Sequence, residues 1–133
     1  MTTTVREAAA RPPDPVLELS RASGDLLVLT HVYTATLVLG VGALFGMLQG
    51  FSRANFIVMP PWFDYYRMLT AHGVLMALVF TTFFITGLLT YATYRTIPRP
   101  GRSTRLNWIG YCTMLAGTAI ATAAISVPSS ITQ

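Results

Sequence analysis

Three long apolar stretches without a charged side chain divide the sequence. Residues 26–52, 68–94 and 106–133 contain no Asp, Glu, Lys or Arg. A helix needs about 20 apolar residues to cross the hydrocarbon core of a bilayer. Each stretch therefore predicts one transmembrane helix, over about residues 26–51, 68–94 and 106–127.

These stretches predict helices and not β-strands. Each is apolar without interruption, whereas the strands of a membrane barrel alternate apolar and polar positions over about 10 residues. A helix also pairs its backbone polar groups within itself, as the bilayer interior requires. Aromatic residues typical of membrane interfaces flank the second span and open the third: Trp62, Tyr65, Tyr66, Tyr91, Tyr94, Trp108 and Tyr111. We expect an all-α membrane protein with three transmembrane helices.

The segments outside the three spans are short and polar. Residues 1–25 are polar and rich in proline, which predicts a disordered tail with at most one helical turn around residues 16–19. The connection 52–67 contains Pro60-Pro61, which breaks any helix there. Pro128 ends or kinks the third span and leaves residues 128–133 as the C-terminal end.

The charged and sulfur-bearing residues exclude several classes of function. The net charge of +4 comes from nine arginines spread over the tail and the loops, not from one basic face, so no nucleic acid partner is expected. A single cysteine, Cys112, excludes an internal disulfide and a cysteine metal cluster. All five acidic residues lie outside the apolar stretches, which excludes a carboxylate pair within the membrane.

The distribution of arginines predicts the orientation in the membrane. Seven of them lie in the tail and around the loop 96–105, and two lie around the connection 52–67: Arg6, Arg11, Arg21, Arg95, Arg99, Arg102 and Arg105 against Arg53 and Arg67. Positive residues remain on the cytoplasmic side. We therefore expect the N-terminus and the loop 96–105 in the cytoplasm, and the C-terminus outside, in the plasma membrane of a prokaryote.

Two histidines lie within the apolar stretches, near opposite ends of the membrane. His31 is about five residues into the first span and His72 about four into the second. At 1.5 Å per residue they differ in depth by roughly 20 Å and cannot bind one metal ion. We expect a structural role for His31, because beside Thr30 and Tyr33 it can reach water or a headgroup. An ionisable residue within a span indicates function by default. For His72 two hypotheses therefore remain: a functional role, or a purely structural hydrogen bond to a neighbouring helix.

The residues around His72 carry a resemblance to a known family. The stretch 63–91, FDYYRMLTAHGVLMALVFTTFFITGLLTY, resembles the second transmembrane helix of subunit I of the haem-copper oxygen reductases, most closely the B-type. The segments 42–49 (GALFGMLQ) and 97–108 (IPRPGRSTRLNW) are similar to parts of its first helix and of the turn into its third. The loop 96–105 has no acidic residue, unlike the A-type members, which fits the B-type.

The resemblance implies a haem-binding role. In that family the histidine of the corresponding Leu-Thr-x-His-Gly-Val motif is an axial ligand of the low-spin haem, and His72 is the matching residue. Tyr65, Leu69 and Met76, together with Leu75 and Val79, would then form the wall beside the haem. A histidine ligand donates its second ring nitrogen to a hydrogen-bond partner, and we expect a backbone carbonyl near Gly42 or Gly46 to be that partner.

The same resemblance implies that these three helices are the first part of a larger fold. In the family several groups lie in later helices: the second ligand of the low-spin haem, the ligand of the active-site haem, the copper-binding histidines and the cross-linked tyrosine. This chain alone would therefore be inactive. The implied process is electron transfer from cytochrome c or quinol to oxygen in aerobic respiration, coupled to proton movement. The implied partners are the remaining helices of subunit I, the other oxidase subunits and the lipid bilayer. Two alternatives remain open: a small three-helix assembly or packing subunit without a cofactor, and a haem subunit similar to nitric oxide reductase.

Overall fold

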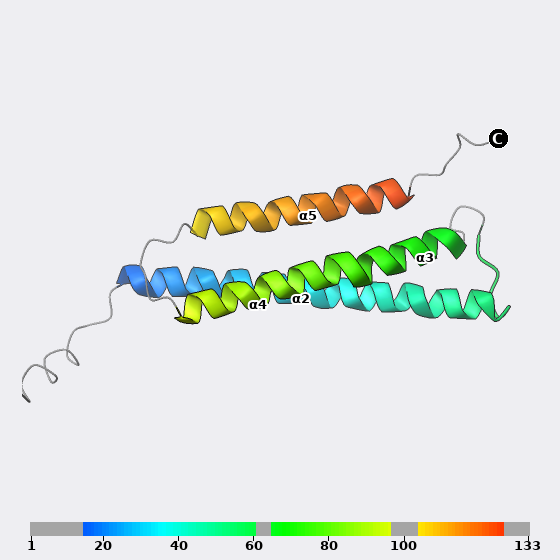
Figure 1. Ribbon diagram of the computed structural model, residues 1–133, viewed down its shortest axis with the longest axis horizontal. Coiled ribbons are helices and arrows are strands. Elements are labelled where there is room, and N and C mark those ends of the chain that lie inside the picture. Colours follow the sequence, from blue (N-terminus) through cyan, green and yellow to red (C-terminus); the bar gives the residue numbers. More distant parts are fainter. Residues whose placement is uncertain (1–14, 61–64, 97–103, 127–133) are drawn as a thin grey trace, which may run out of the picture.

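Three long helices make up the structure. The computed structural model describes residues 15–60, 65–96 and 104–126. Its elements are α2 (Pro15–Arg53), α3 (Tyr65–Gly73), the π-helix η1 (Val74–Phe80), α4 (Thr81–Thr96) and α5 (Thr104–Ser126). Because α3, η1 and α4 follow one another without a break, they form one rod (Figure 1). Each of the three helices is long and apolar enough to cross a membrane, which confirms the predicted fold class.

The helices run up, down and up, so that the charged ends gather in two groups. The rod lies antiparallel to α2, and α5 runs beside them in the direction of α2 (Figure 1). Arg21, Arg95 and Arg105 therefore lie toward one end of the molecule. Arg53 and Arg67 lie toward the other. The described helices thus place these arginines in the two groups on which the predicted orientation depends.

The first helix starts earlier than predicted. Residues 15–25 were expected to belong to a disordered tail, but α2 begins at Pro15 and runs for 39 residues. Proline in the first turn needs no N–H partner, and Glu18 in that turn favours the positive end of the helix dipole. A helix that has already formed also extends at little cost through polar residues. Residues 1–14 and 127–133 lie outside the described part of the chain.

Packing between α2 and the rod follows a narrow stripe. The buried residues of α2 are spaced three or four apart: Gly24, Leu27, His31, Ala35, Val38 and Gly42. The core joins Ala35 and Val38 of α2 to Val79 and Phe83 of the rod. Glycines allow the helices to approach each other there, because a Cβ on Gly24 would lie 2.9 Å from the Tyr94 ring. Close backbone approach at small residues is a common way for membrane helices to associate.

The π-helix keeps the inward face of the rod in line. From Ala71 to Gly87, the positions that face α2 recur every four residues, through 75, 79 and 83. In an α-helix each step of four residues overshoots a full turn by about 40°, so four steps would drift by about 160°. The wider turn of η1 takes up part of this drift. His72 and the residues of α4 can therefore pack against the same helix.

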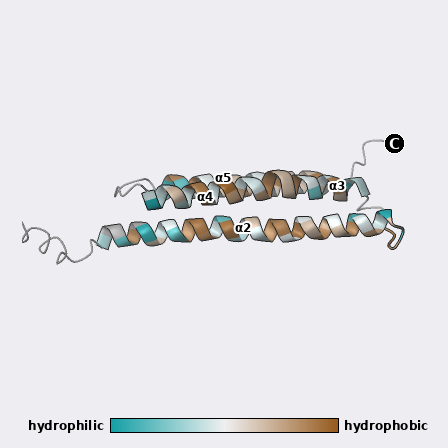
Figure 2. Cartoon of the chain, turned by 60° about the horizontal axis from the view of Figure 1, so that its bottom comes forward, coloured by the Kyte–Doolittle hydropathy of each residue, from teal (hydrophilic) through white to brown (hydrophobic). Residues whose placement is uncertain are grey.

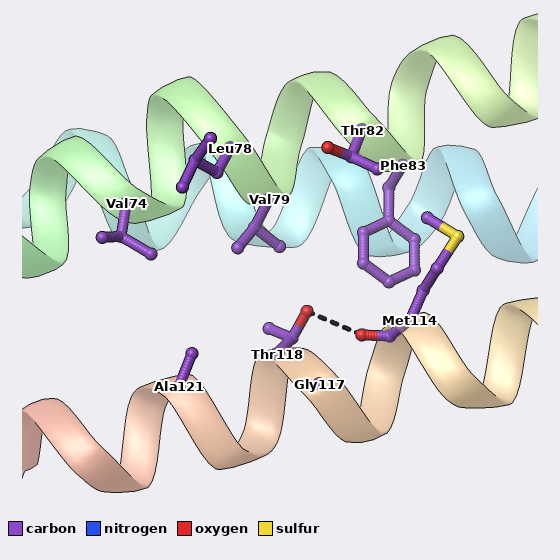
Figure 3. A pocket seen from close by; sticks show the side chains of 9 residues that line it. All are labelled: Val74, Leu78, Val79, Thr82, Phe83, Met114, Gly117, Thr118 and Ala121. Atoms are coloured by element: carbon purple, nitrogen blue, oxygen red, sulfur yellow. Dashed lines mark hydrogen bonds between the residues drawn. The ribbon is translucent and has the colours of Figure 1, made fainter.

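The third helix packs loosely on the other two. No described residue of α5 is fully buried, and a Cβ on Gly110 or Gly117 would meet no atom within 4 Å. A groove of about 270 Å³ separates α5 from η1 and α4, with Val74 and Val79 on one side and Gly117 and Ala121 on the other (Figure 3). Apolar residues also cover outward faces of the helices (Figure 2), including Leu37, Leu78 and Ile120.

Candidate functional site

The ring of His72 lies on a glycine of α2. His72 is the penultimate residue of α3, and the π-helix begins two positions after it, at Val74. A Cβ on Gly46 would lie 2.8 Å from Cε1 and 2.9 Å from Nδ1 of His72. Real side-chain atoms do not approach so closely, so only glycine at position 46 leaves room for the ring.

A hydrogen bond fixes the tautomer of this histidine. Nδ1 of His72 lies 2.7 Å from the carbonyl oxygen of Gly42. Because a carbonyl can only accept, Nδ1 carries the proton and donates, which leaves the lone pair on Nε2. The expectation that a carbonyl near Gly42 or Gly46 holds the ring is confirmed for Gly42. The sequence alone could reach this partner because two small residues one turn apart mark the place where another helix approaches.

The second ring nitrogen is available to a ligand. Within the described residues, no hydrogen bond reaches Nε2 of His72. The described residues also contain no enclosed side-chain nitrogen or oxygen that lacks a partner. Nε2 is therefore accessible from outside the three helices. A neutral imidazole with one nitrogen donating to a carbonyl and the other presenting its lone pair is the usual form of a metal-ligating histidine.

The predicted wall residues divide into two groups. Leu69 is exposed, and Tyr65 accepts a hydrogen bond of 3.1 Å from Nε2 of Gln49. Met76 instead packs on α2, since its sulfur would lie 2.9 Å from a Cβ on Gly42. Val79 is buried in the core against α2, the same helix on which the ring of His72 lies.

His31 lies in a different environment from the one predicted. It is only 2% exposed and does not reach the surface. Its Nδ1 lies 2.8 Å from the carbonyl oxygen of Leu27, and its ring meets Tyr111 edge-on at 4.9 Å. Position 31 belongs to the inward stripe of α2, opposite Gly87, whose Cβ would lie 2.9 Å from that of His31. The expectation that His31 reaches water relied on its neighbour Tyr33, but Tyr33 lies on an exposed face of α2 and His31 on the buried one.

The two histidines belong to separate sites. His31 lies opposite Gly87 and His72 lies opposite Gly46, so 15 residues separate the two contacts along α2. At 1.5 Å per residue this distance is about 22 Å. Within the described ranges, no three His, Cys, Asp or Glu side chains come together as metal ligands. Cys112 is exposed on α5.

Comparison with known proteins identified one family. Residues 26–133 match the family model described as Cytochrome C and Quinol oxidase polypeptide I. Neither the curated proteins nor the solved structures contained a match to the chain. The matched region begins close to the start of the first predicted span and includes all three helices beyond the first turns of α2.

Proposed function

Since the chain belongs to the cytochrome c and quinol oxidase polypeptide I family, we propose that it forms the first helices of a terminal oxidase subunit I and that His72 is an axial ligand of its low-spin haem. The match supports an oxidase-type oxidoreductase in a multi-pass membrane location. The arrangement of His72 on Gly42 and Gly46 is the observation that supports the ligand role.

The residues around His72 fit a haem iron. The Gly42 carbonyl accepts a hydrogen bond from Nδ1–H of His72. Nε2 therefore presents a lone pair without any change of tautomer. The absent Cβ of Gly46 leaves room for the ring close to α2, where a larger residue would displace it. A hydrogen bond of this kind also raises the basicity of the ligand nitrogen. A bound low-spin haem supplies a one-electron carrier between the donor and the site of oxygen reduction.

Other side chains near His72 have supporting roles in this proposal. Leu69 contributes apolar surface beside the ligand, and Met76 closes the space over Gly42. An apolar environment excludes water and so tunes the potential of a haem. Tyr65 and Gln49 join α3 to the end of α2 through their hydrogen bond and so hold the helix that carries His72.

The remaining parts of the reaction belong to other segments. The second axial ligand, the copper and the second haem would be held by later helices of subunit I. Cytochrome c or quinol would deliver electrons through the assembled complex. The loop 96–105, which has no acidic residue, supports a B-type member of the family. The arginine distribution supports an N-terminus in the cytoplasm, and the proposed location is the plasma membrane of a prokaryote.

The ligand role is tested in the assembled oxidase by the substitution His72→Ala. We expect loss of the low-spin haem band from the reduced-minus-oxidised difference spectrum, because Nε2 is the atom proposed to hold the iron. His31→Ala is the matched control, and it should leave the band in place because His31 is about 22 Å away. A band of full intensity in the His72→Ala oxidase refutes the assignment, because the haem is then held by residues outside this chain. That result favours the alternative of a three-helix packing subunit without a cofactor.

A further inference from the structure

The connection that leaves α2 carries four consecutive apolar residues. Residues 56–59 read Phe-Ile-Val-Met, and no charged residue lies between Arg53 and Asp64. Phe56 is 79% exposed and Val58 is 97% exposed. Exposed apolar runs of this kind are not typical of a loop in water, and they mark surfaces that contact a partner or a membrane. We call residues 54–59 the apolar corner.

The hydrogen bonds at the end of α2 fold this corner back along the helix. The N–H of Phe56 donates to the carbonyl of Phe51 at 3.0 Å, and the N–H of Asn55 donates to the carbonyl of Ser52 at 3.2 Å. Asn55 adopts a left-handed conformation with a φ of 59°, which asparagine tolerates better than most residues. These features form the Schellman motif, in which an apolar contact commonly joins the two outer residues. The chain therefore turns back and does not continue away from the helix.

The apolar contact of this motif is formed by two aromatic rings. The rings of Phe51 and Phe56 meet edge-on, with their centroids 6.4 Å apart. A helical side chain leans toward the N-terminus of its helix, so the Phe51 ring lies on the membrane side of its own Cα. Because Phe56 packs on this ring, it also lies on the membrane side of Arg53, the last residue of α2. Met47, one turn before Phe51, is 50% exposed and continues the apolar surface toward the span.

The position of the corner along α2 corresponds to the membrane interface. The charge-free stretch 26–52 is centred on Leu39, and Phe51 follows 12 residues later. Phe51 therefore lies about 18 Å from the centre along the helix. The hydrocarbon core of a bilayer ends about 15 Å from its centre, and the headgroup region ends about 20 Å from it. The backbone of residues 57–60 is irregular, and water at the headgroups can hydrogen-bond it while the side chains reach the acyl chains.

The charge beside the corner complements a phospholipid. Residues 47–60 contain one charged side chain, that of Arg53, and it is exposed. Arginine next to exposed apolar side chains is typical of segments that lie in a membrane interface. Its guanidinium remains among the phosphates while the apolar groups are buried below it. The same segment contains no acidic side chain that would repel the phosphates.

We propose that the apolar corner inserts into the lipid leaflet at this end of the molecule. Phe56 and Val58 lie among the outermost acyl segments, and Arg53 lies at the level of the phosphates. The connection between α2 and α3 is then an interfacial anchor and not a loop in water. This anchor fixes the depth of the end of α2 that contacts the His72 ring through Gly46.

The depth of the corner is tested with spin labels in the assembled complex in phospholipid vesicles. A nitroxide is attached to Phe56→Cys or Val58→Cys in a Cys112→Ala chain, and the signal of the Cys112→Ala parent is subtracted. Oxygen partitions into acyl chains, whereas a nickel chelate stays in water. The ratio of oxygen to nickel collisions should be several-fold higher at both positions than at Ala54→Cys, because Ala54 is exposed and directly follows Arg53.

Two results of this measurement overturn the proposal. Equal ratios at the corner and at position 54 place the corner in water. A label that meets neither reagent shows that protein covers the corner. The two corner variants replace each other if one fails to accumulate.

A photochemical crosslink identifies the molecule that lies on the corner. p-Benzoylphenylalanine in place of Phe56 reacts with a nearby C–H bond when the native membrane is illuminated. We expect the mass of the chain to rise by that of one phospholipid, with much less of this product when the same group replaces Ala54. A crosslink to a protein subunit, or no lipid adduct, overturns the proposal. Both experiments are read without the haem spectrum, so neither result depends on the proposed role of His72.

Discussion

At the scale of the residue, one turn of α2 determines the state of the His72 ring. The carbonyl oxygen of Gly42 accepts a hydrogen bond from Nδ1 of the ring, and the missing side chain of Gly46 leaves room for the ring. This pairing could be predicted from the sequence because glycines one turn apart mark a close approach. The burial of His31 could not be predicted in the same way. Apolar residues surround α2 on all sides, so their pattern does not distinguish the face that packs on the rod from the face that meets lipid.

The space at Gly46 makes a specific prediction. Gly46→Ala places a Cβ 2.8 Å from Cε1 of His72, so the ring must turn away from the Gly42 carbonyl. Overpacking of this kind costs about 1–3 kcal/mol. We expect weaker or shifted low-spin haem absorbance in the assembled oxidase, and a changed midpoint potential in a redox titration.

The matched control is Gly50→Ala, one turn further along the same helix. A Cβ there would meet no atom within 4 Å. The substitution should therefore leave the spectrum and the potential unchanged. If Gly46→Ala and Gly50→Ala give the same spectrum, the contact between Gly46 and the His72 ring has no part in haem binding.

At the scale of the element, the π-helix explains why regular helical spacing described only part of the rod. The three spans themselves follow from long charge-free stretches. Nothing in Val74–Phe80 marks a wider turn, because the segment has no proline, no glycine and no polar residue. Its effect is visible only in the packing, where Val79 is buried and Leu78 is exposed. π-Helices of this kind often occur next to functional residues, and this one begins two positions after His72.

Insertion of a second alanine after Ala77 tests the register that η1 sets. Ala77 is exposed, so the added residue puts no side chain into the core. One added residue turns His72 by about 100° relative to α4. We expect the chain to accumulate in the membrane with much less low-spin haem. Ala77→Leu keeps the length of the rod and should retain the haem. An insertion variant with an unchanged difference spectrum would show that this register is not needed.

At the scale of the whole molecule, three helices leave much apolar surface without a partner. Ile109 and Ile120 of α5 are exposed, and a Cβ on Gly40 of α2 would meet no atom within 4 Å. Such faces suit further helices of the same subunit, as membership of the family implies. The rings of both histidines lie between α2 and the rod, and the proposed haem site is completed by later helices.

The orientation of these helices in the membrane gives the last prediction. Their up-down-up course brings Arg21, Arg95 and Arg105 toward one end, and positive residues favour the cytoplasm. Single cysteines at Ser52 and at Ser103, each in a Cys112→Ala chain, are treated with a membrane-impermeant thiol reagent on intact cells. Labelling is expected at position 52 and not at position 103, with both positions labelled after the cells are opened. The reverse pattern on intact cells would place the N-terminus outside and overturn the predicted orientation.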